Sequence, residues 1–282
     1  MSSHPFVVKL GGALLDRPET AGSFFSALAR LHRERREGVV VVHGGGAAVD
    51  RHLSALGFET ERREGIRITP PEQIEAIAGV LAGSMNKRLV GILRALGLPA
   101  VGLCLGDAGV AECRPSTAFP FDPGRVGEIC GGRPRLLEVL LAEGFLPVLS
   151  SIGLDGEGGL LNVNADDAAA GLAKLLRARE LVLLTDVSGV LGPDGSLLPR
   201  LDATEIARGI EEGWIAGGMI AKVRGALAAA EAARVPVRIA SWAEPASLLA
   251  LLDGHQPGAC GTCVDLEVDA DSTHPERIGS ST

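Results

Sequence analysis

The 282-residue chain contains no tyrosine and only nine aromatic residues, seven phenylalanines and two tryptophans. Lysine is scarce as well, with four lysines beside 23 arginines. Acidic residues outnumber basic ones by 35 to 27, which gives a formal net charge of −8. Nucleic-acid binding needs clustered bases and stacking rings, so this composition argues against that class of protein. An apolar content of 46% is too high for a disordered chain.

The chain also lacks a run of eighteen apolar residues, and its N-terminus has no charged region followed by a long apolar one. We therefore expect neither a membrane span nor a signal peptide. Five cysteines make no disulfide framework at this length, so reduced thiols in a cytoplasmic protein are the expectation. Cys260 and Cys263 form one C-x-x-C without a second ligand pair, which favours ordinary thiols over a zinc or redox site.

Short β-branched apolar runs alternate with amphipathic stretches along the whole chain. Residues 39–42 are apolar on both faces, as in a buried parallel strand. Helical spacing predicts helices over 24–36 and 70–96, the second with Thr69 as its N-cap. The alternation predicts an α/β fold, a three-layer αβα sandwich in which helices cover both faces of a mostly parallel central sheet.

The chain shows no internal repeat and no long linker. Charged residues at 177–180 mark a soft boundary between an N-terminal lobe, 1–178, and a C-terminal lobe, 179–282. Scattered glycine and proline over 107–128 predict a hairpin excursion. The polar tail 271–282 is expected to be frayed.

Two glycine-rich loops follow the first two predicted strands. Lys9-Leu-Gly-Gly12 places an ammonium beside exposed backbone N–H groups, and His43-Gly-Gly-Gly46 can aim several N–H groups at one cluster of oxygens. Either loop alone is compatible with a plain turn. Ligands bind at the carboxyl ends of strands in such sheets, so two loops on successive strands favour an anion cradle.

Two later loops add polar groups. Asn162 and Asn164 point the same way in an alternating stretch, although Asn164 or Asp166 could simply cap the helix that follows. Thr185–Leu191 follows a further apolar strand, and a Gly-Gly pair opens the helix whose first turn carries Lys222.

Motifs for other chemistries are absent. The sequence has no Gly-Lys dipeptide and hence no P-loop, no H-R-D or D-F-G, and no G-x-G-x-x-G after a strand. It also lacks G-x-S-x-G and H-E-x-x-H. The remaining glycine loops and isolated lysines suit phosphate handling by positioning and charge, without a covalent nucleophile.

Together these loops resemble the amino acid kinase family, with the motifs in family order from about residue 5 to about 265. Two of the six motifs, GIRIT and NVNAD, favour the branch that phosphorylates N-acetyl-L-glutamate over those acting on aspartate, glutamate, carbamate or UMP. The motifs are KLGG at 9–12, HGGG at 43–46, GIRIT at 65–69, NVNAD at 162–166, LTDVSGVL at 184–191 and GGMIAK at 217–222.

The resemblance implies phosphoryl transfer from ATP to the side-chain carboxylate of N-acetyl-L-glutamate, in arginine biosynthesis. Lys9 and Lys222 would stabilise the transferring phosphoryl group, and Asp166 would orient both lysines. Mg²⁺ would be held mainly by the ATP phosphates, without a protein metal site. By the same resemblance, the residues that bind the acetylated substrate are Gly45, Gly46, Arg67 and Asn162. Those that border the nucleotide are Gly11, Gly12, Asp186, Val187, Ser188, Gly189, Val190, Leu191, Trp214, Ile215 and Ala216.

The chemistry agrees with these roles. The acceptor carboxylate has a reference pKa of about 4.3 and is already anionic at neutral pH, so no general base is needed. The difficulty is its repulsion from the triphosphate, which ammonium groups, N–H donors and Mg²⁺ can offset. Lysine offers a compact charge for this task, whereas Arg67 suits bidentate recognition of a planar carboxylate.

Departures from the family pattern are few. Ala221 stands where many relatives have proline, and Cys263 stands where a base is usual. Arginine-inhibited relatives carry an extra helix before the first strand, and here five residues precede Phe6. The resemblance therefore predicts an arginine-insensitive homodimer.

Two alternatives stay open. A relative that phosphorylates carrier-protein-linked aminoadipate or glutamate in lysine synthesis should show a basic surface at the acceptor site, for which Arg62, Arg63 and Arg67 are thin evidence. A silent amino-acid sensor on the same fold should have lost a phosphate-side lysine, yet Lys9 and Lys222 are both present.

Overall fold

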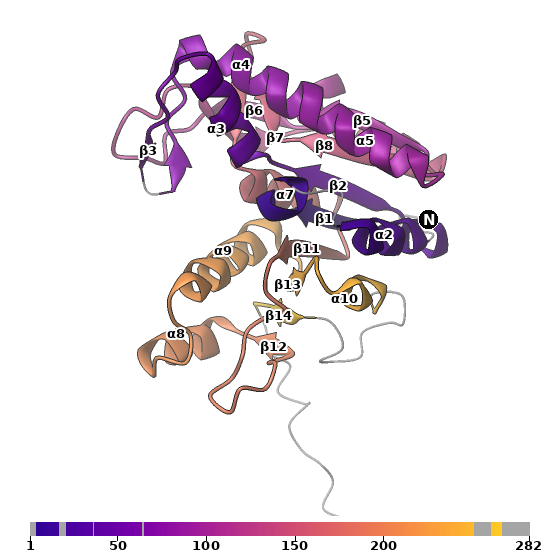
Figure 1. The fold of residues 1–282 in the computed structure, drawn as a ribbon, viewed down its shortest axis with the longest axis vertical. Helices are drawn as coiled ribbons and strands as arrows, with labels where there is room; N and C mark the ends of the chain where they lie inside the picture. The colour runs from indigo at the N-terminus through magenta and orange to yellow at the C-terminus, as the bar shows by residue number, and fades with distance from the viewer. Residues whose placement is uncertain (1–3, 17–20, 36, 64, 251–260, 267–282) are drawn as a thin grey trace, which may run out of the picture.

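An eight-stranded sheet forms the centre of the molecule (Figure 1). The computed structural model describes residues 4–16, 21–35, 37–63, 65–250 and 261–266. The strand order is β12-β14-β13-β11-β1-β2-β8-β5, and every neighbouring pair is parallel except β13 with β14. The strands are β1 (Phe6–Leu10), β2 (Val39–His43), β5 (Ala100–Cys104), β8 (Leu146–Ser150), β11 (Glu180–Thr185), β12 (Arg200–Leu201), β13 (Val237–Ser241) and β14 (Thr262–Val264).

Successive residues of the central strands face two separate cores. Val40 and Val42 of β2 join one buried cluster, while Val39 and Val41 join the other. This period of two buries both faces of a parallel strand, so both faces need helices. The prediction of a three-layer αβα sandwich is confirmed. One face is covered by α2 (Gly22–Glu34), α5 (Asn86–Ala95) and α10 (Pro245–Leu249), the other by α6 (Arg135–Ala142), α7 (Ala165–Leu175), α8 (Ala203–Glu211) and α9 (Gly218–Ala233).

The helical run predicted over 70–96 consists of four consecutive pieces. They are a 3₁₀ turn (Pro71–Gln73), α4 (Ile74–Ala78), a π-helical stretch (Gly79–Met85) and α5. Thr69 does not cap this run, because Pro70 holds the N-cap position and the Thr69 hydroxyl is buried and donates to the Arg67 carbonyl. That part of the prediction is wrong.

The same run, Pro71–Ala95, is long and apolar enough to cross a membrane when judged by length and composition alone. This is weak evidence, because core helices pass the same test. Leu89 and Leu93 pack into one of the two sheet-side cores, while 39% of the most apolar window is buried. The absence of a membrane span stays a prediction.

A second sheet of four strands, in the order β6-β7-β10-β9, packs beside the first. The predicted hairpin supplies its antiparallel pair β6 (Glu112–Pro115) and β7 (Val126–Gly131). The strands β9 (Ile152–Leu154) and β10 (Leu160–Val163) complete it, and the sequence did not predict them as a sheet. A two-stranded hairpin, β3 (Arg62–Arg63) with β4 (Ile66–Arg67), lies near α3 (Gly46–Ala55).

The division into lobes at 178/179 stays a prediction. The central sheet runs through that boundary without a break, because β1 pairs with β11 from Phe6 to Lys9. The last strand of the described residues is β14, Thr262–Val264. Cys260 and the tail 271–282 lie outside the described residues.

Candidate active site

Two cavities open at the carboxyl ends of the central strands and share three lining residues, Lys9, Gly12 and Asp166. The first, here called the hairpin-side cavity, has a volume of about 240 Å³ and lies under the β3–β4 hairpin. The second, the β11-side cavity, has a volume of about 410 Å³ and lies between β11 and α9. Further lining residues are Gly44, Gly45, Gly46, Arg62, Arg67, Ser151 and Asn162 in the first, and Gly11, Thr185, Asp186, Lys222 and Trp242 in the second.

The junction of the cavities holds an ion pair. Lys9 projects from the fourth residue of β1, and its Nζ lies 2.8 Å from Oδ1 of Asp166 at the start of α7. The side chain of Asn164 caps that helix by accepting from the backbone N–H of Asp166. Of the two candidate caps, Asn164 therefore plays this part. Two residues after Lys9, the close packing on β11 requires glycine at position 11, because a Cβ there would lie 2.7 Å from the Leu184 carbonyl oxygen.

Lys222 lies on the wall of the β11-side cavity with a different partner. Its Nζ is 3.1 Å from Oδ1 of Asp186, in the loop after β11. The hydrogen bond and charge of Lys222 lower the pKa of Asp186, so this carboxylate is ionised at neutral pH. The predicted arrangement had Asp166 beside both lysines. In the structure each lysine has its own carboxylate, Asp166 for Lys9 and Asp186 for Lys222.

The glycine loop after β2 lines the hairpin-side cavity, and the side chain of His43, the last residue of β2, is hydrogen bonded to it. The buried imidazole donates from Nδ1 to the Gly44 carbonyl at 2.9 Å and accepts at Nε2 from Asn86 Nδ2 at 3.1 Å. Burial lowers the pKa of His43, so the ring is neutral and can keep both roles. Asn86 also donates to the Val148 carbonyl at 2.9 Å, which ties the loop to β8. No motif or spacing singles out Asn86, which lies in a helical run.

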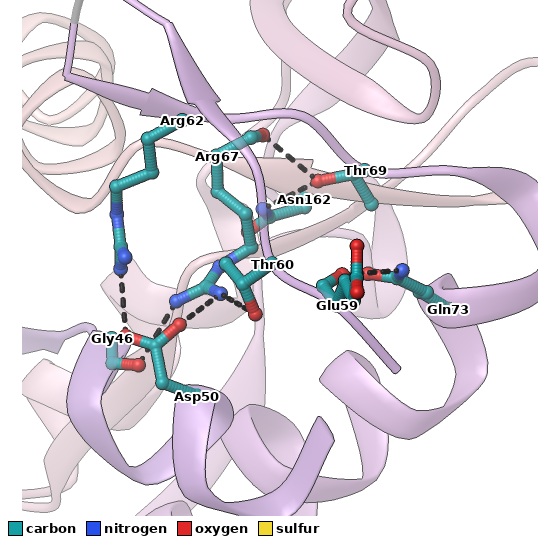
Figure 2. Close-up of polar contacts among 9 residues, drawn as sticks. All are labelled: Gly46, Asp50, Glu59, Thr60, Arg62, Arg67, Thr69, Gln73 and Asn162. Carbon is teal, nitrogen blue, oxygen red and sulfur yellow. Dashed lines mark hydrogen bonds and ion pairs between the residues drawn. The ribbon is translucent and has the colours of Figure 1, made fainter. Parts of the chain in front are cut away.

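Arg67 and Asn162 line the same cavity, and both are hydrogen bonded to the Thr69 hydroxyl (Figure 2). Arg67 is buried, donates from Nη2 to the Gly46 carbonyl at 2.9 Å and donates from Nη1 to Asp50. Asn162 of β10 donates to the Thr69 hydroxyl at 3.0 Å. All four residues predicted to bind the acetylated substrate, Gly45, Gly46, Arg67 and Asn162, thus line one cavity.

Three of the residues predicted to border the nucleotide, Gly11, Gly12 and Asp186, line the β11-side cavity. The residues of the loop that follows Asp186 do not line this cavity. Val187 donates its N–H to the Thr185 hydroxyl at 3.0 Å, and Ser188 donates to Glu244. Gly189 packs against Thr262, Val190 is buried and donates to Thr262, and Leu191 is exposed and pairs with Leu197.

The structure places Trp214, Ile215 and Ala216 apart from the residues that line this cavity. The Trp214 indole donates to Glu212 at 3.1 Å and its ring packs on Gly209 of α8, while Ile215 is buried in the core. The aromatic residue on the cavity wall is Trp242, which the sequence analysis did not select. Trp242 directly follows the carboxyl end of β13, and this position at a strand end is the feature of the sequence that could have identified it.

Within the described ranges, no group of three or more His, Cys, Asp or Glu side chains is arranged to hold a metal ion. The carboxylates that face the cavities are those of Asp166 and Asp186. The site therefore offers two ammonium groups, backbone N–H groups from glycine loops, one buried guanidinium and two carboxylates. Such a set suits transfer of a phosphoryl group between two anions.

Comparison with known families agrees with this geometry. The model of the amino acid kinase family matches residues 5–241. The chain belongs to the amino acid kinase family. Among curated relatives it is 46% identical to an acetylglutamate kinase from Aeromonas salmonicida over 266 residues, which cover 94% of this chain and all of that one. It is also 46% identical to an acetylglutamate kinase from Colwellia psychrerythraea, over 90% of this chain and 95% of that one.

Several solved structures are similar to this one in fold. An N-acetylglutamate synthase from Neisseria gonorrhoeae, complexed with coenzyme A and N-acetyl-glutamate, superposes with a TM-score of 0.77 at 26% identity, over 95% of this chain and 61% of that one. A carbamate kinase from Giardia superposes with a TM-score of 0.61 at 18% identity, over 94% and 99% of the two chains. The second likeness concerns the fold alone.

Proposed function

We propose that this family member transfers the terminal phosphoryl group of ATP to the side-chain carboxylate of N-acetyl-L-glutamate, giving N-acetyl-L-glutamyl 5-phosphate for arginine biosynthesis. The observation that carries the proposal is the junction of the two cavities at Lys9, Gly12 and Asp166. An acceptor in one cavity and a nucleotide in the other would meet beside the Lys9 ammonium. Relatives named acetylglutamate kinase, 46% identical over nearly the whole chain, support this choice of acceptor.

The hairpin-side cavity would hold N-acetyl-L-glutamate. Arg67 offers a planar guanidinium to the α-carboxylate, and Asn162 offers an amide to the acetylamino group. The N–H groups of Gly45 and Gly46 lie at the start of α3, where the helix dipole favours a carboxylate. The phosphoryl acceptor would thus point toward Lys9.

The lysines would act on the charge that develops during transfer. Lys9 and Lys222 are each held by a carboxylate that a phosphoryl oxygen can replace, because both pairs are partly exposed and such pairs contribute little by themselves. The acceptor is anionic at neutral pH, so the site needs no residue that removes a proton. Catalysis would rest on alignment and on neutralising the repulsion between donor and acceptor.

Mg²⁺ would bind mainly to the ATP phosphates. Mg²⁺ retains water and commonly takes only one or two protein carboxylates. Asp166 and Asp186, whose carboxylates line the β11-side cavity, are the residues that would supply them. The Mg²⁺ would neutralise phosphate charge when bound.

The two-lobe organisation is part of the same proposal. The residues that line the hairpin-side cavity all lie between 9 and 166. The β11-side cavity is lined by Lys9, Gly11, Gly12 and Asp166 and otherwise by residues between 183 and 242. The N-terminal lobe, 1–178, would therefore bind N-acetyl-L-glutamate and the C-terminal lobe, 179–282, would bind ATP.

We also propose a cytoplasmic homodimer. The run Pro71–Ala95 is strongly apolar but only partly buried, and β5 is an edge strand of the central sheet. A second copy packed on this surface would cover both. The free cysteines of the described part, Cys104, Cys113, Cys130 and Cys263, suit a reducing compartment. Light scattering should give the mass of a dimer, and a hexamer would contradict the proposal.

A coupled assay of ADP release tests the activity directly. We expect turnover with N-acetyl-L-glutamate and ATP, and an acyl phosphate product that hydroxylamine traps. Turnover with glutamate, aspartate or carbamate instead would overturn the proposed substrate. Among the described residues, the basic surface expected for the carrier-protein alternative is neutralised, because Arg62 pairs with Asp50 at 2.9 Å and Arg63 pairs with Glu61 at 2.7 Å.

A further inference from the structure

Three charged side chains form a network at the mouth of the hairpin-side cavity (Figure 2). Asp50, on the second turn of α3, accepts from Arg67 of β4 through one carboxylate oxygen. It accepts from Nη2 of Arg62, on β3, through the other oxygen at 2.9 Å. Both arginines line the cavity. The proposed reaction assigns a role to Arg67 alone, so Asp50 and Arg62 are left without one.

The position of the Arg67 guanidinium depends on this network. Its side chain is only 7% exposed, and a guanidinium in such a place requires an anionic partner. Asp50 supplies the anion, and the Gly46 carbonyl and the Thr60 hydroxyl, 2.9 and 3.4 Å away, supply further acceptors. Burial alone would raise the pKa of Asp50, but hydrogen bonds from Arg67 and Arg62 outweigh this and lower it. Asp50 is therefore anionic at neutral pH.

Both guanidinium groups converge on the first residue of α3. Nη2 of Arg62 and Nη2 of Arg67 lie 3.6 and 3.9 Å from the point where a Cβ of Gly46 would be. Gly46 lines the same cavity. Two positive charges and the single negative charge of Asp50 leave a net charge of about +1 there, which matches one carboxylate.

We propose that Asp50 is a positioning residue that holds Arg67 and Arg62 as a two-guanidinium clamp, and that Arg62 is a second binding residue for the α-carboxylate of the substrate. The inference rests on the proposed function. The clamp gives the enzyme its selectivity for a free α-carboxylate, because a neutral group in that place leaves one charge unmatched. Asp50 acts through the arginines and does not contact the reacting atoms.

The test compares Asp50→Asn with the wild type on two acceptors, N-acetyl-L-glutamate and its α-carboxamide, in the ADP-release assay. Asparagine keeps the shape of the side chain and removes its charge. We expect the KM for N-acetyl-L-glutamate to rise about 10- to 100-fold, the loss expected when a hydrogen bond to a charged group is removed. The kcat and the KM for ATP should change less than about twofold. For the α-carboxamide the two enzymes should have similar KM values, because the interaction that Asp50 supports is absent.

A pair of neighbouring arginines provides the second variant and its control. Arg62→Gln should raise the KM for N-acetyl-L-glutamate about threefold to fivefold, the effect of a partly exposed charge pair, and leave the α-carboxamide unaffected. Arg63→Gln should change neither value, because Arg63 pairs with Glu61 and does not line the cavity. Arg62 is 45% exposed, so its substitution tests the clamp even if Asp50→Asn fails to fold.

Three results would overturn the clamp. A lower KM for N-acetyl-L-glutamate in Asp50→Asn would show that Asp50 competes with the substrate. An equal rise in KM for both acceptors would show a purely structural role. An Arg62→Gln enzyme identical to wild type on N-acetyl-L-glutamate would remove the second binding residue. Each of these requires an active wild-type enzyme, whereas a wild type that does not turn over N-acetyl-L-glutamate would refute the proposed function itself.

Discussion

The two cavities that meet at Lys9 are built in different ways. In the hairpin-side cavity the buried guanidinium of Arg67 is held by three partners, Asp50, Gly46 and Thr60. In the β11-side cavity Lys222 and Asp186 form one pair, with side chains 31% and 67% exposed. The first arrangement suits a small substrate that must be selected by shape and charge. The second suits a ligand that brings its own charge and metal ion, since an exposed pair separates easily.

The largest expected effect concerns the two ammonium groups, one at the junction of the cavities and the other on the wall of the β11-side cavity. Lys9→Ala and Lys222→Ala should each lower kcat by about 10²- to 10³-fold, because each removes a charge that stabilises the transition state. ADP release measures the loss, and circular dichroism checks the fold. Lys174→Ala serves as the control, because Lys174 lines neither of the two cavities. An active Lys222→Ala enzyme would refute the proposed role.

Arg67→Gln should act on one cavity only. Removing the buried guanidinium loses a carboxylate contact and leaves Asp50 with less compensation, so the KM for N-acetyl-L-glutamate should rise about 100-fold. The KM for ATP should stay nearly constant. Initial rates at varied concentrations of each substrate separate the two values. A larger effect on ATP than on N-acetyl-L-glutamate would contradict the assignment of the cavities.

The two cavities should also differ in what their polar groups contribute to stability. Asn86→Ala removes the partner of the buried His43 Nε2 and of the Val148 carbonyl, so the free energy of unfolding should fall by about 1–3 kcal/mol. Asp186→Asn, at an exposed pair, should change it by less than about 0.5 kcal/mol. Urea denaturation measures both. Equal losses would show that the β11-side cavity is as firmly built as the other.

The pH dependence of stability should reveal the Asp50 network. The pKa of Asp50 is lower in the folded protein than in the unfolded chain, so its stabilising effect is present above the unfolded value of about 3.9. The effect is lost as the pH falls through the folded pKa. The stability difference between wild type and Asp50→Asn should therefore be constant from pH 7 to about 5 and shrink below about 4. Urea titrations at several pH values measure it, and a difference that grows with acid would contradict the direction of the shift.

The smallest expected effect is a difference in the KM for ATP between substitutions of two tryptophans. Trp242 lines the β11-side cavity, and its buried indole N–H has no partner among the described residues. Trp242→Ala should raise the KM for ATP about threefold to tenfold, as expected for loss of one aromatic contact. Trp214→Ala should change it less than about twofold, since Trp214 packs on α8. The reverse order would restore the interpretation drawn from the sequence motif.

Much of the candidate site could be predicted from the sequence, because its residues lie at the carboxyl ends of recognisable strands. Lys9 and the glycines after β2 occupy loops whose positions are fixed once the strands are recognised, since parallel strands bring their carboxyl ends to one edge. The three-layer sandwich follows from the alternation of apolar strands and amphipathic helices in the same way. A parallel sheet thus makes its loops predictable from local patterns.

The remainder depends on contacts between distant segments. Asp50 and Arg67 meet across 17 residues, and Asn86 reaches His43 across 43. A single sequence gives no sign of such pairs, because an aspartate on a helix is usually solvated. The four-stranded sheet was missed because β9 and β10 have only three and four residues. The π-helical stretch was missed because its apolar spacing differs little from that of an α-helix.

The place of β1 in the central sheet has a mechanical consequence. This strand is hydrogen bonded on both sides, to β2 and to β11, along the length that carries Lys9. The ammonium at the junction is therefore anchored to a strand that is paired along both edges, and neither neighbouring strand can slide past β1 without breaking these hydrogen bonds. Any closing movement that brings donor and acceptor together would have to come from parts outside this continuous sheet, such as the separate two-stranded β3–β4 hairpin (Figure 1). In the proposed reaction, Lys9 would then be the fixed point against which both ligands are aligned.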